Sequence, residues 1–123
     1  MMDEDARSFR VALVADEYVN PGRGGGLDAL AVLGPAGWGV MQLPPSTYSD
    51  EIARPLLEQV AEQVEEFVRR DYDVILVGRR AGLEEALAAM GVGAPDDVVP
   101  ATGDELTAFV SARPAPRAAA ARA

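Results

Sequence analysis

Two short apolar runs constrain the fold of this chain more than any other feature of its sequence. The first covers residues 10–15 (RVALVA), and the second covers residues 74–77 (VILV) and stops at Gly78. Continuous runs of apolar and β-branched residues are typical of strands buried on both faces, as in a parallel sheet covered by helices. Two weaker runs, at 38–43 and 97–101, predict two further strands.

Segments with helical periodicity follow these runs. In the long segment 51–70, apolar residues recur at three- and four-residue spacing, with Glu and Arg on the opposite side. Ser49 is placed to cap its start. Shorter helices are predicted at 82–90 and 104–112, and Thr102 with Glu105 forms a capping box for the second of these.

Residues 27–33 fit two structures. The Gly-Pro pair that follows them is a stop signal for a short helix, but the same turn residues suit a hairpin between 30–33 and 38–43. We favour the helix because it completes a regular β-α-β alternation.

This alternation predicts an α/β fold with a mostly parallel four-stranded sheet and right-handed crossovers. The two most apolar strands belong in the centre of the sheet. Pro100 lacks an N–H, and Gly39 and Gln42 interrupt the apolar pattern of their run, so their strands belong at the edges. The predicted order is 2-1-3-4, a small three-layer flavodoxin-like or Rossmann-like domain.

The amino-acid composition excludes several kinds of catalytic and metal-binding site. The chain has 123 residues, no Cys, no His and no Lys, and a formal net charge of −9. These absences exclude thiolate nucleophiles, imidazole acid–base catalysis, Cys/His metal sites and a P-loop lysine. We therefore expect no catalytic or metal-binding residues. The acidity disfavours nucleic-acid partners.

The sequence predicts three regions: an acidic, disordered N-terminus at 1–8, one α/β domain at 9–112, and a disordered Ala/Pro/Arg tail at 113–123. The tail carries no large apolar residue, so we expect its removal to leave the melting temperature unchanged. No apolar segment is long enough to span a bilayer, and no secretory signal is evident. We expect no membrane association and a cytoplasmic location.

Ligands of open α/β sheets bind beyond the carboxyl ends of the strands, where the strand order reverses. Here that switch point lies between strands 10–15 and 74–77. Two loops carry candidate ligand-binding residues there. The first contributes Asp16, Glu17 and the glycine-rich stretch Gly22–Gly26, with Arg23, Gly24 and Gly25; the second contributes Gly78, Arg79 and Arg80.

Each candidate group has two interpretations. The glycine-rich stretch either cradles a phosphate or is a loop with left-handed positions. Asp16 and Glu17 either bind a hard cation or begin a solvated loop. Arg79 and Arg80 either bind an anion or neutralise Asp16 and Glu17, and we favour this inert ion-pair cluster.

The acidic pair Asp16–Glu17 after the first strand, together with the β-α alternation, resembles the receiver domain of response regulators over residues 9–112. In that family a phospho-accepting Asp ends the third strand, and a Lys follows the fifth. Here Gly78 stands at the acceptor position, no Lys exists, and a fifth strand is missing. The resemblance therefore implies a receiver-like shape without receiver phosphorylation.

Two functions remain open. The chain is either a non-catalytic binding or protein-interaction module, which we favour, or an enzyme or nucleotide- or phosphometabolite-binding domain that uses the Gly22–Gly26 loop and the switch point. The sequence identifies no cofactor. We also expect a homodimer, because a 20-residue helix is about 30 Å long and outruns strands of about 20 Å. Its apolar stripe needs cover at the ends.

Overall fold

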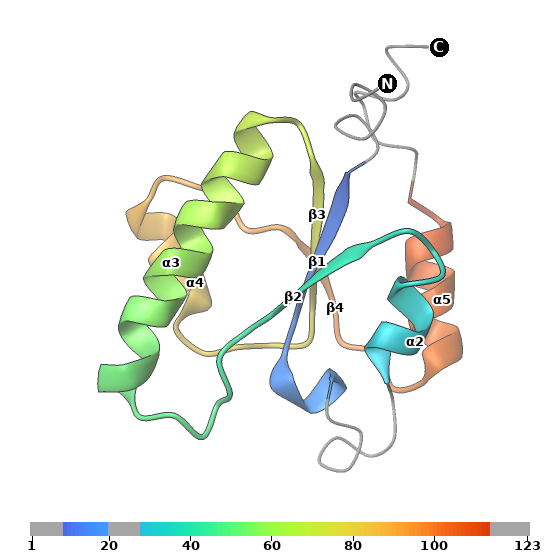
Figure 1. The fold of residues 1–123 in the computed structure, drawn as a ribbon, viewed down its shortest axis with the longest axis horizontal. Helices are drawn as coiled ribbons and strands as arrows, with labels where there is room; N and C mark the ends of the chain where they lie inside the picture. Colours follow the sequence, from blue (N-terminus) through green and yellow to red (C-terminus); the bar gives the residue numbers. More distant parts are fainter. Residues whose placement is uncertain (1–8, 20–27, 114–123) are drawn as a thin grey trace.

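A four-stranded, all-parallel sheet in the order β2-β1-β3-β4 lies at the centre of the computed structural model, which describes residues 9–19 and 28–113 (Figure 1). Its strands and helices alternate along the chain, as the sequence predicts. In chain order they are β1 (Arg10–Val14), the 3-10 helix η1 (Asp16–Tyr18), α2 (Ala29–Leu33), β2 (Gly39–Gln42), α3 (Asp50–Arg69), β3 (Asp73–Val77), α4 (Leu83–Ala89), β4 (Asp96–Val98) and α5 (Gly103–Ser111).

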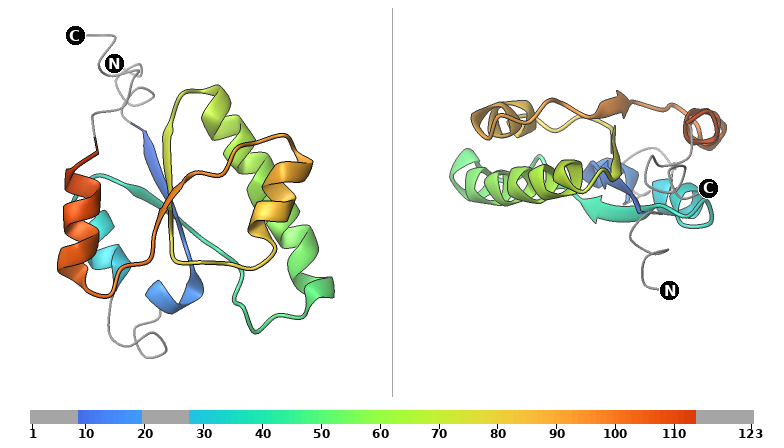
Figure 2. Two further views of the ribbon diagram at one scale, coloured as in Figure 1. Left: turned by 180° about the vertical axis from the view of Figure 1, so that it is seen from behind. Right: turned by 90° about the horizontal axis from the view of Figure 1, so that it is seen from above.

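Helices cover both faces of the sheet, which confirms the predicted three-layer α/β fold (Figure 2). α3 and α4 lie on one face, and Leu13 and Leu76 point toward them. α2 and α5 lie on the other face, where Val14 and Ile75 are buried. Because successive strand residues point to opposite faces, a strand covered on both sides must be apolar throughout, as β1 and β3 are.

Of the two structures that fit residues 27–33, a helix or a hairpin strand, the chain adopts the helix. Residues 29–33 are helical, and Asp28 caps them by accepting the N–H of Leu30. Thr102 accepts the N–H of Glu105 at the start of α5, so this half of the capping box forms. Ser49 occupies the N-cap position of α3, but its side chain makes no capping hydrogen bond. β4 ends two residues before Pro100, whose missing N–H cannot extend a strand.

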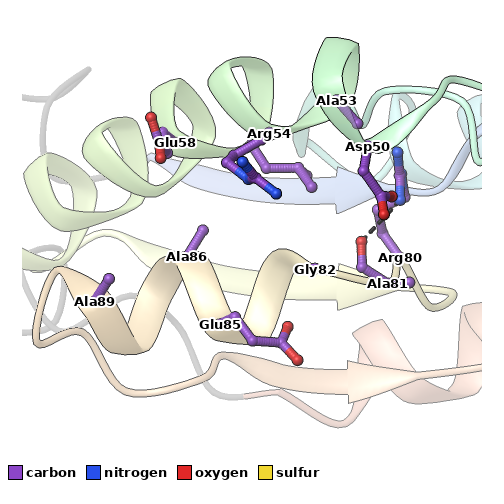
Figure 3. A pocket seen from close by; sticks show the side chains of 11 residues that line it. Asp50, Ala53, Arg54, Glu58, Arg80, Ala81, Gly82, Glu85, Ala86 and Ala89 are labelled. Carbon is purple, nitrogen blue, oxygen red and sulfur yellow. Dashed lines mark hydrogen bonds between the residues drawn. The ribbon is translucent and has the colours of Figure 1, made fainter.

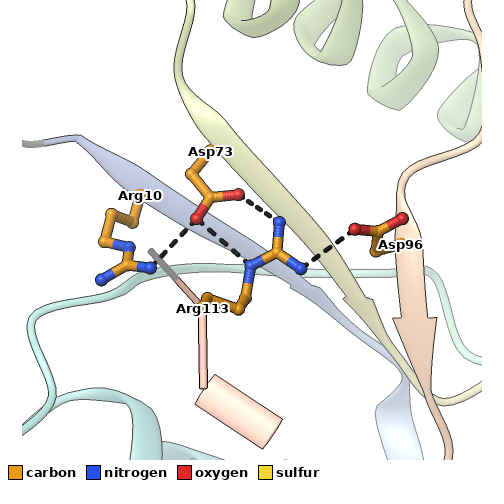
Figure 4. Close-up of polar contacts among 4 residues, drawn as sticks. All are labelled: Arg10, Asp73, Asp96 and Arg113. Carbon is orange, nitrogen blue, oxygen red and sulfur yellow. Dashed lines mark hydrogen bonds and ion pairs between the residues drawn. The ribbon is translucent and has the colours of Figure 1, made fainter. Parts of the chain in front are cut away.

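An ion-pair cluster joins three strands and the segment after α5 at the amino end of the sheet (Figure 4). Asp73 at the start of β3 binds Arg10 of β1 and Arg113 beyond α5, and Arg113 also reaches Asp96 of β4. The Arg10 guanidinium lies 4.5 Å from the ring centroid of the buried Trp38. Burial raises the pKa of Asp73, but the hydrogen bonds and charges of the two arginines outweigh it and hold that pKa below its usual value.

Arg113 was assigned to the tail by sequence, yet it is half-buried and paired in this cluster. The remaining predicted tail, 114–123, and the N-terminal stretch 1–8 lie outside the described residues. No helix within the described ranges is both long and apolar enough to cross a bilayer.

Candidate functional site

The carboxyl ends of β1, β2 and β3 meet at the predicted switch point. The Ala15 N–H donates to the Val77 carbonyl over 2.9 Å, which joins β1 to the end of β3. Asp16 follows directly and is only 7% exposed. Its carboxylate accepts a hydrogen bond from Nε2 of Gln42 over 3.1 Å, so it ties η1 to the end of β2. Asp16 therefore has a structural partner within the fold.

Gly78 and the Tyr18 ring fill the space above β1 and β3. Gly78 has a positive φ of +90°, and its N–H donates to Val98 over 2.8 Å. A Cβ at this position would lie 2.6 Å from Cε2 of Tyr18 and 2.8 Å from Cβ of Ala15. The site thus needs glycine because two side chains pack directly on its main chain. The place where open α/β sheets bind ligands is occupied by the chain's own tyrosine.

The Tyr18 phenol is in an environment that keeps it neutral. Burial raises its pKa, and the charges of Glu17 and Glu105 raise it further. A phenol of this kind offers a hydrogen bond but no anionic nucleophile.

The two predicted arginines have different surroundings. The Arg80 guanidinium donates hydrogen bonds to main-chain carbonyls. Its Nε donates to the Pro44 carbonyl over 2.6 Å, Nη2 to the Pro45 carbonyl over 3.1 Å, and Nη1 to the Ala81 carbonyl. Arg80 therefore fastens the segment after β2 to the loop after β3. Arg79 is exposed, and neither a hydrogen bond nor an ion pair joins it to a described residue.

The expected ion-pair cluster at the switch point is therefore wrong for the described residues, because Arg79 and Arg80 do not pair with Asp16 or Glu17. Arg80 donates to main-chain carbonyls instead, and the ion pairs of Asp73 lie at the opposite end of the sheet. Arg23, Gly24 and Gly25 lie outside the described residues, so the glycine-rich loop stays a prediction. Residues 9–19 and 28–113 hold no cluster of three or more acidic side chains that could bind a metal ion.

A groove of about 440 Å³ lies between α3 and α4. Small side chains such as Ala53 and Ala86 open it, and Arg80 is the one predicted site residue that lines it. Figure 3 shows Asp50 pointing toward Arg80, with Arg54 between the helices. Because its lining also includes Glu58 and Glu85, its charges are of both signs, and it selects neither anions nor cations.

A second groove, the β2-edge groove, has a volume of about 460 Å³ and runs between α3 and the free edge of β2. Its lining is apolar with a few amides and includes no charged residue. The ten residues are Met41, Gln42, Leu43, Pro44, Pro45, Tyr48, Leu56, Gln59, Val60 and Gln63. All three glutamines of the chain are among them.

The neutrality of this groove is unusual for the chain, in which 25% of residues are charged. It reflects the sequence: no charged residue occurs between Asp28 and Asp50. On α3, Ile52, Leu56, Gln59 and Gln63 continue the uncharged stripe, because residues three and four apart share a helix face. Tyr48 of the groove lining and Ile52 of this stripe are 43% and 55% exposed.

The two edge strands of the sheet, β2 and β4, differ in their charge. Edge strands are normally protected from pairing by charges, proline or extreme shortness. β4 has all three, with Asp96, Asp97 and the flanking Pro95 around a three-residue strand. β2 has no charge at all. Sequence reasoning missed this contrast, although the uncharged stretch 29–49 was its visible signal.

No family model matches the chain, and neither does any curated protein or solved structure.

Proposed function

We propose that this chain is a non-catalytic protein-interaction module whose binding surface is the β2-edge groove with the exposed face of α3 beside it. The observation that carries the proposal is the lining: ten residues without a charge, in a chain of net charge −9. Charge-depleted, partly apolar surface with exposed aromatic side chains is typical of interface cores.

Three features give the groove the properties of a peptide-binding surface. Among the residues that the structure describes, no strand pairs with the outer edge of β2, so an added strand can use its main-chain groups. Tyr48 of the lining, and Ile52 one helical turn before Leu56 on α3, supply exposed apolar area. The glutamines can donate and accept hydrogen bonds, so they match a polar main chain. A cytoplasmic location remains part of the proposal as an expectation from the sequence.

The alternative is an enzyme or a nucleotide- or phosphometabolite-binding domain that uses the switch point. Against it stand the Tyr18 ring packed on Gly78 and the carbonyl bonds that occupy Arg80. In its favour, Arg79 is exposed and adjacent to the switch point. A thermal-shift panel of nucleotides, flavins, phosphorylated metabolites and Mg²⁺ separates the two. A ligand at a hundredfold excess over its Kd would stabilise the fold by about 2.7 kcal/mol, whereas we expect no shift.

Site-specific photo-crosslinking in the expressing cell tests the interaction surface itself. A photoreactive amino acid at Gln59 lies in the groove, and one at the exposed Ala88 of α4 is the matched control. We expect discrete protein adducts from position 59 and none of them from position 88. Equal patterns from both positions, or no adduct from 59, would remove the proposal.

A further inference from the structure

We infer that the occupant of the β2-edge groove is a second copy of this chain, joined across a two-fold axis at the β2 edge. This inference rests on the proposed function of the groove and adds the identity of its partner. It is carried by charge, by the direction of the free main-chain groups and by the amide content of the groove.

Charge favours this face for self-association. Two copies that each carry −9 repel one another, and the nearest charges dominate that repulsion because salt screens the distant ones. Copies therefore meet at least cost through a face that has no charge. A basic partner would instead choose the acidic faces, such as the outer side of α3 with Glu58 and Glu62.

The main chain of β2 is arranged for pairing. The Leu43 N–H donates to Val14 of β1, and successive residues of a strand point their main-chain groups in opposite directions. Met41 therefore also faces β1, whereas Val40 and Gln42 direct their N–H and C=O groups to the open edge. β1 is the one described strand that pairs with β2.

A two-fold axis at Met41 uses all of these groups. It places Val40 opposite Gln42 of the partner subunit, and two such residues exchange both hydrogen bonds in an antiparallel pair. Met41 then meets the partner's Met41 as a non-hydrogen-bonded pair on the α3 side of the sheet. The two sheets join into one continuous sheet.

The side chains suit contact with their own copies. In a two-fold interface the same surface patch serves both subunits, so a carboxylate patch would face itself and repel. An amide is both donor and acceptor, so Gln59 and Gln63 can bond to the same residues of a second copy. The β4 edge, with Asp96 and Asp97, would fail this requirement.

Sedimentation velocity from micromolar to millimolar concentration tests the inference on the full chain. We expect the wild type to dimerise. The double variant Gln59→Glu and Gln63→Glu puts like charges on both sides of the axis, so its dimer Kd should rise at least about tenfold at low salt and less at high salt. The control, Ala88→Glu with Thr107→Glu, adds the same charge at exposed positions on α4 and α5, and its Kd should stay near that of the wild type.

A second variant does not depend on charge. The chain has no Cys, so Met41→Cys carries its only thiol. Cα atoms of a non-hydrogen-bonded antiparallel pair lie about 4.5 Å apart, within the range for a disulfide of about 4.4–6.8 Å. Oxidation should give a covalent dimer of Met41→Cys but not of Ala88→Cys.

A wild-type chain that stays monomeric at millimolar concentration would overturn the inference, and so would equal effects of the two charge pairs or equal oxidation of the two cysteine variants. A monomer whose position 59 still crosslinks to another protein would refute the second copy alone and leave the interaction module intact. A monomer without such adducts would refute both.

Discussion

Substitution of Gly78 measures how tightly the switch point is filled. In Gly78→Ala the new methyl group meets three atoms below 3 Å, Cε2 and Cδ2 of Tyr18 and Cβ of Ala15. The tyrosine ring can rotate away, but the alanine Cβ is fixed to the main chain, so the backbone must move. The positive φ of +90° adds about 1–2 kcal/mol for any residue with a Cβ. Overpacking of a filled site adds about 1–3 kcal/mol.

Gly37→Ala is the matched control. Gly37 has a φ of +89°, almost the value of Gly78, but nothing lies within 4 Å of a Cβ built there. Its substitution should therefore cost the backbone contribution alone, about 1–2 kcal/mol. The difference between the two variants isolates the packing of Tyr18 and Ala15.

Urea unfolding followed by Trp38 fluorescence gives both free energies. We expect Gly78→Ala to be less stable than Gly37→Ala by at least about 1 kcal/mol, and part of this difference to vanish when Tyr18 is also replaced by alanine. Equal losses in the two glycine variants would refute the reasoning. They would mean that the space over Gly78 is open and available to a ligand.

Three further predictions concern polar groups. Arg80→Ala should cost about 2 kcal/mol because charged hydrogen bonds to carbonyls are lost, whereas Arg79→Ala should stay within about 0.5 kcal/mol; equal losses in chemical unfolding would contradict the assigned contacts. Deletion of 113–123 should lower the free energy of unfolding by about 1–2 kcal/mol because the ion pairs of Arg113 are lost. Deletion of 114–123 should leave it unchanged because these residues include no large apolar side chain. A large loss in the shorter deletion would show a contact beyond Arg113. In the folded chain the pKa of Asp73 is below its usual value of 3.8. The ionised carboxylate therefore contributes fully to the free energy of unfolding above about pH 4, and this contribution is lost as the pH falls through the lowered pKa. Asp73→Asn should therefore flatten the dependence of stability on pH in that acidic range, and an unchanged slope would show that the ion pairs contribute nothing.

Local patterns were sufficient to predict the layers of this fold. The runs RVALVA and VILV are apolar on both faces, and this requires helices on both sides of the sheet. Pro100 and Gln42 marked the two edge strands, because a missing N–H and a polar side chain are tolerated there.

The partners of polar side chains were not predictable in the same way. Arg80 and Pro44 are 36 residues apart, and the amide of Gln42 reaches Asp16 across 26 residues. Such pairings depend on the angle at which loops leave the sheet, and a residue pattern contains no information about that angle. Position along the sheet was predicted well enough to place Asp16 and Gly78 at the same edge of the sheet, but not to show that the Tyr18 ring packs on Gly78.

The β2-edge groove was missed for a different reason. Its signal in the sequence is not a charged residue but the absence of charge from 29 to 49. In an acidic chain an uncharged edge strand is conspicuous, because charge is the ordinary protection of an edge.

Amide hydrogen exchange, resolved by residue, distinguishes binding at the β2 edge from binding at the switch point. It compares the dilute chain with the assembled state, either the concentrated chain or the complex with a protein that crosslinks at position 59. We expect slower exchange at Val40 and Gln42, whose N–H groups face the outer edge of β2, and unchanged exchange at Asp97 of β4. Protection of Gly78 and Arg79 with none at Val40 and Gln42 would place binding at the switch point and contradict this expectation.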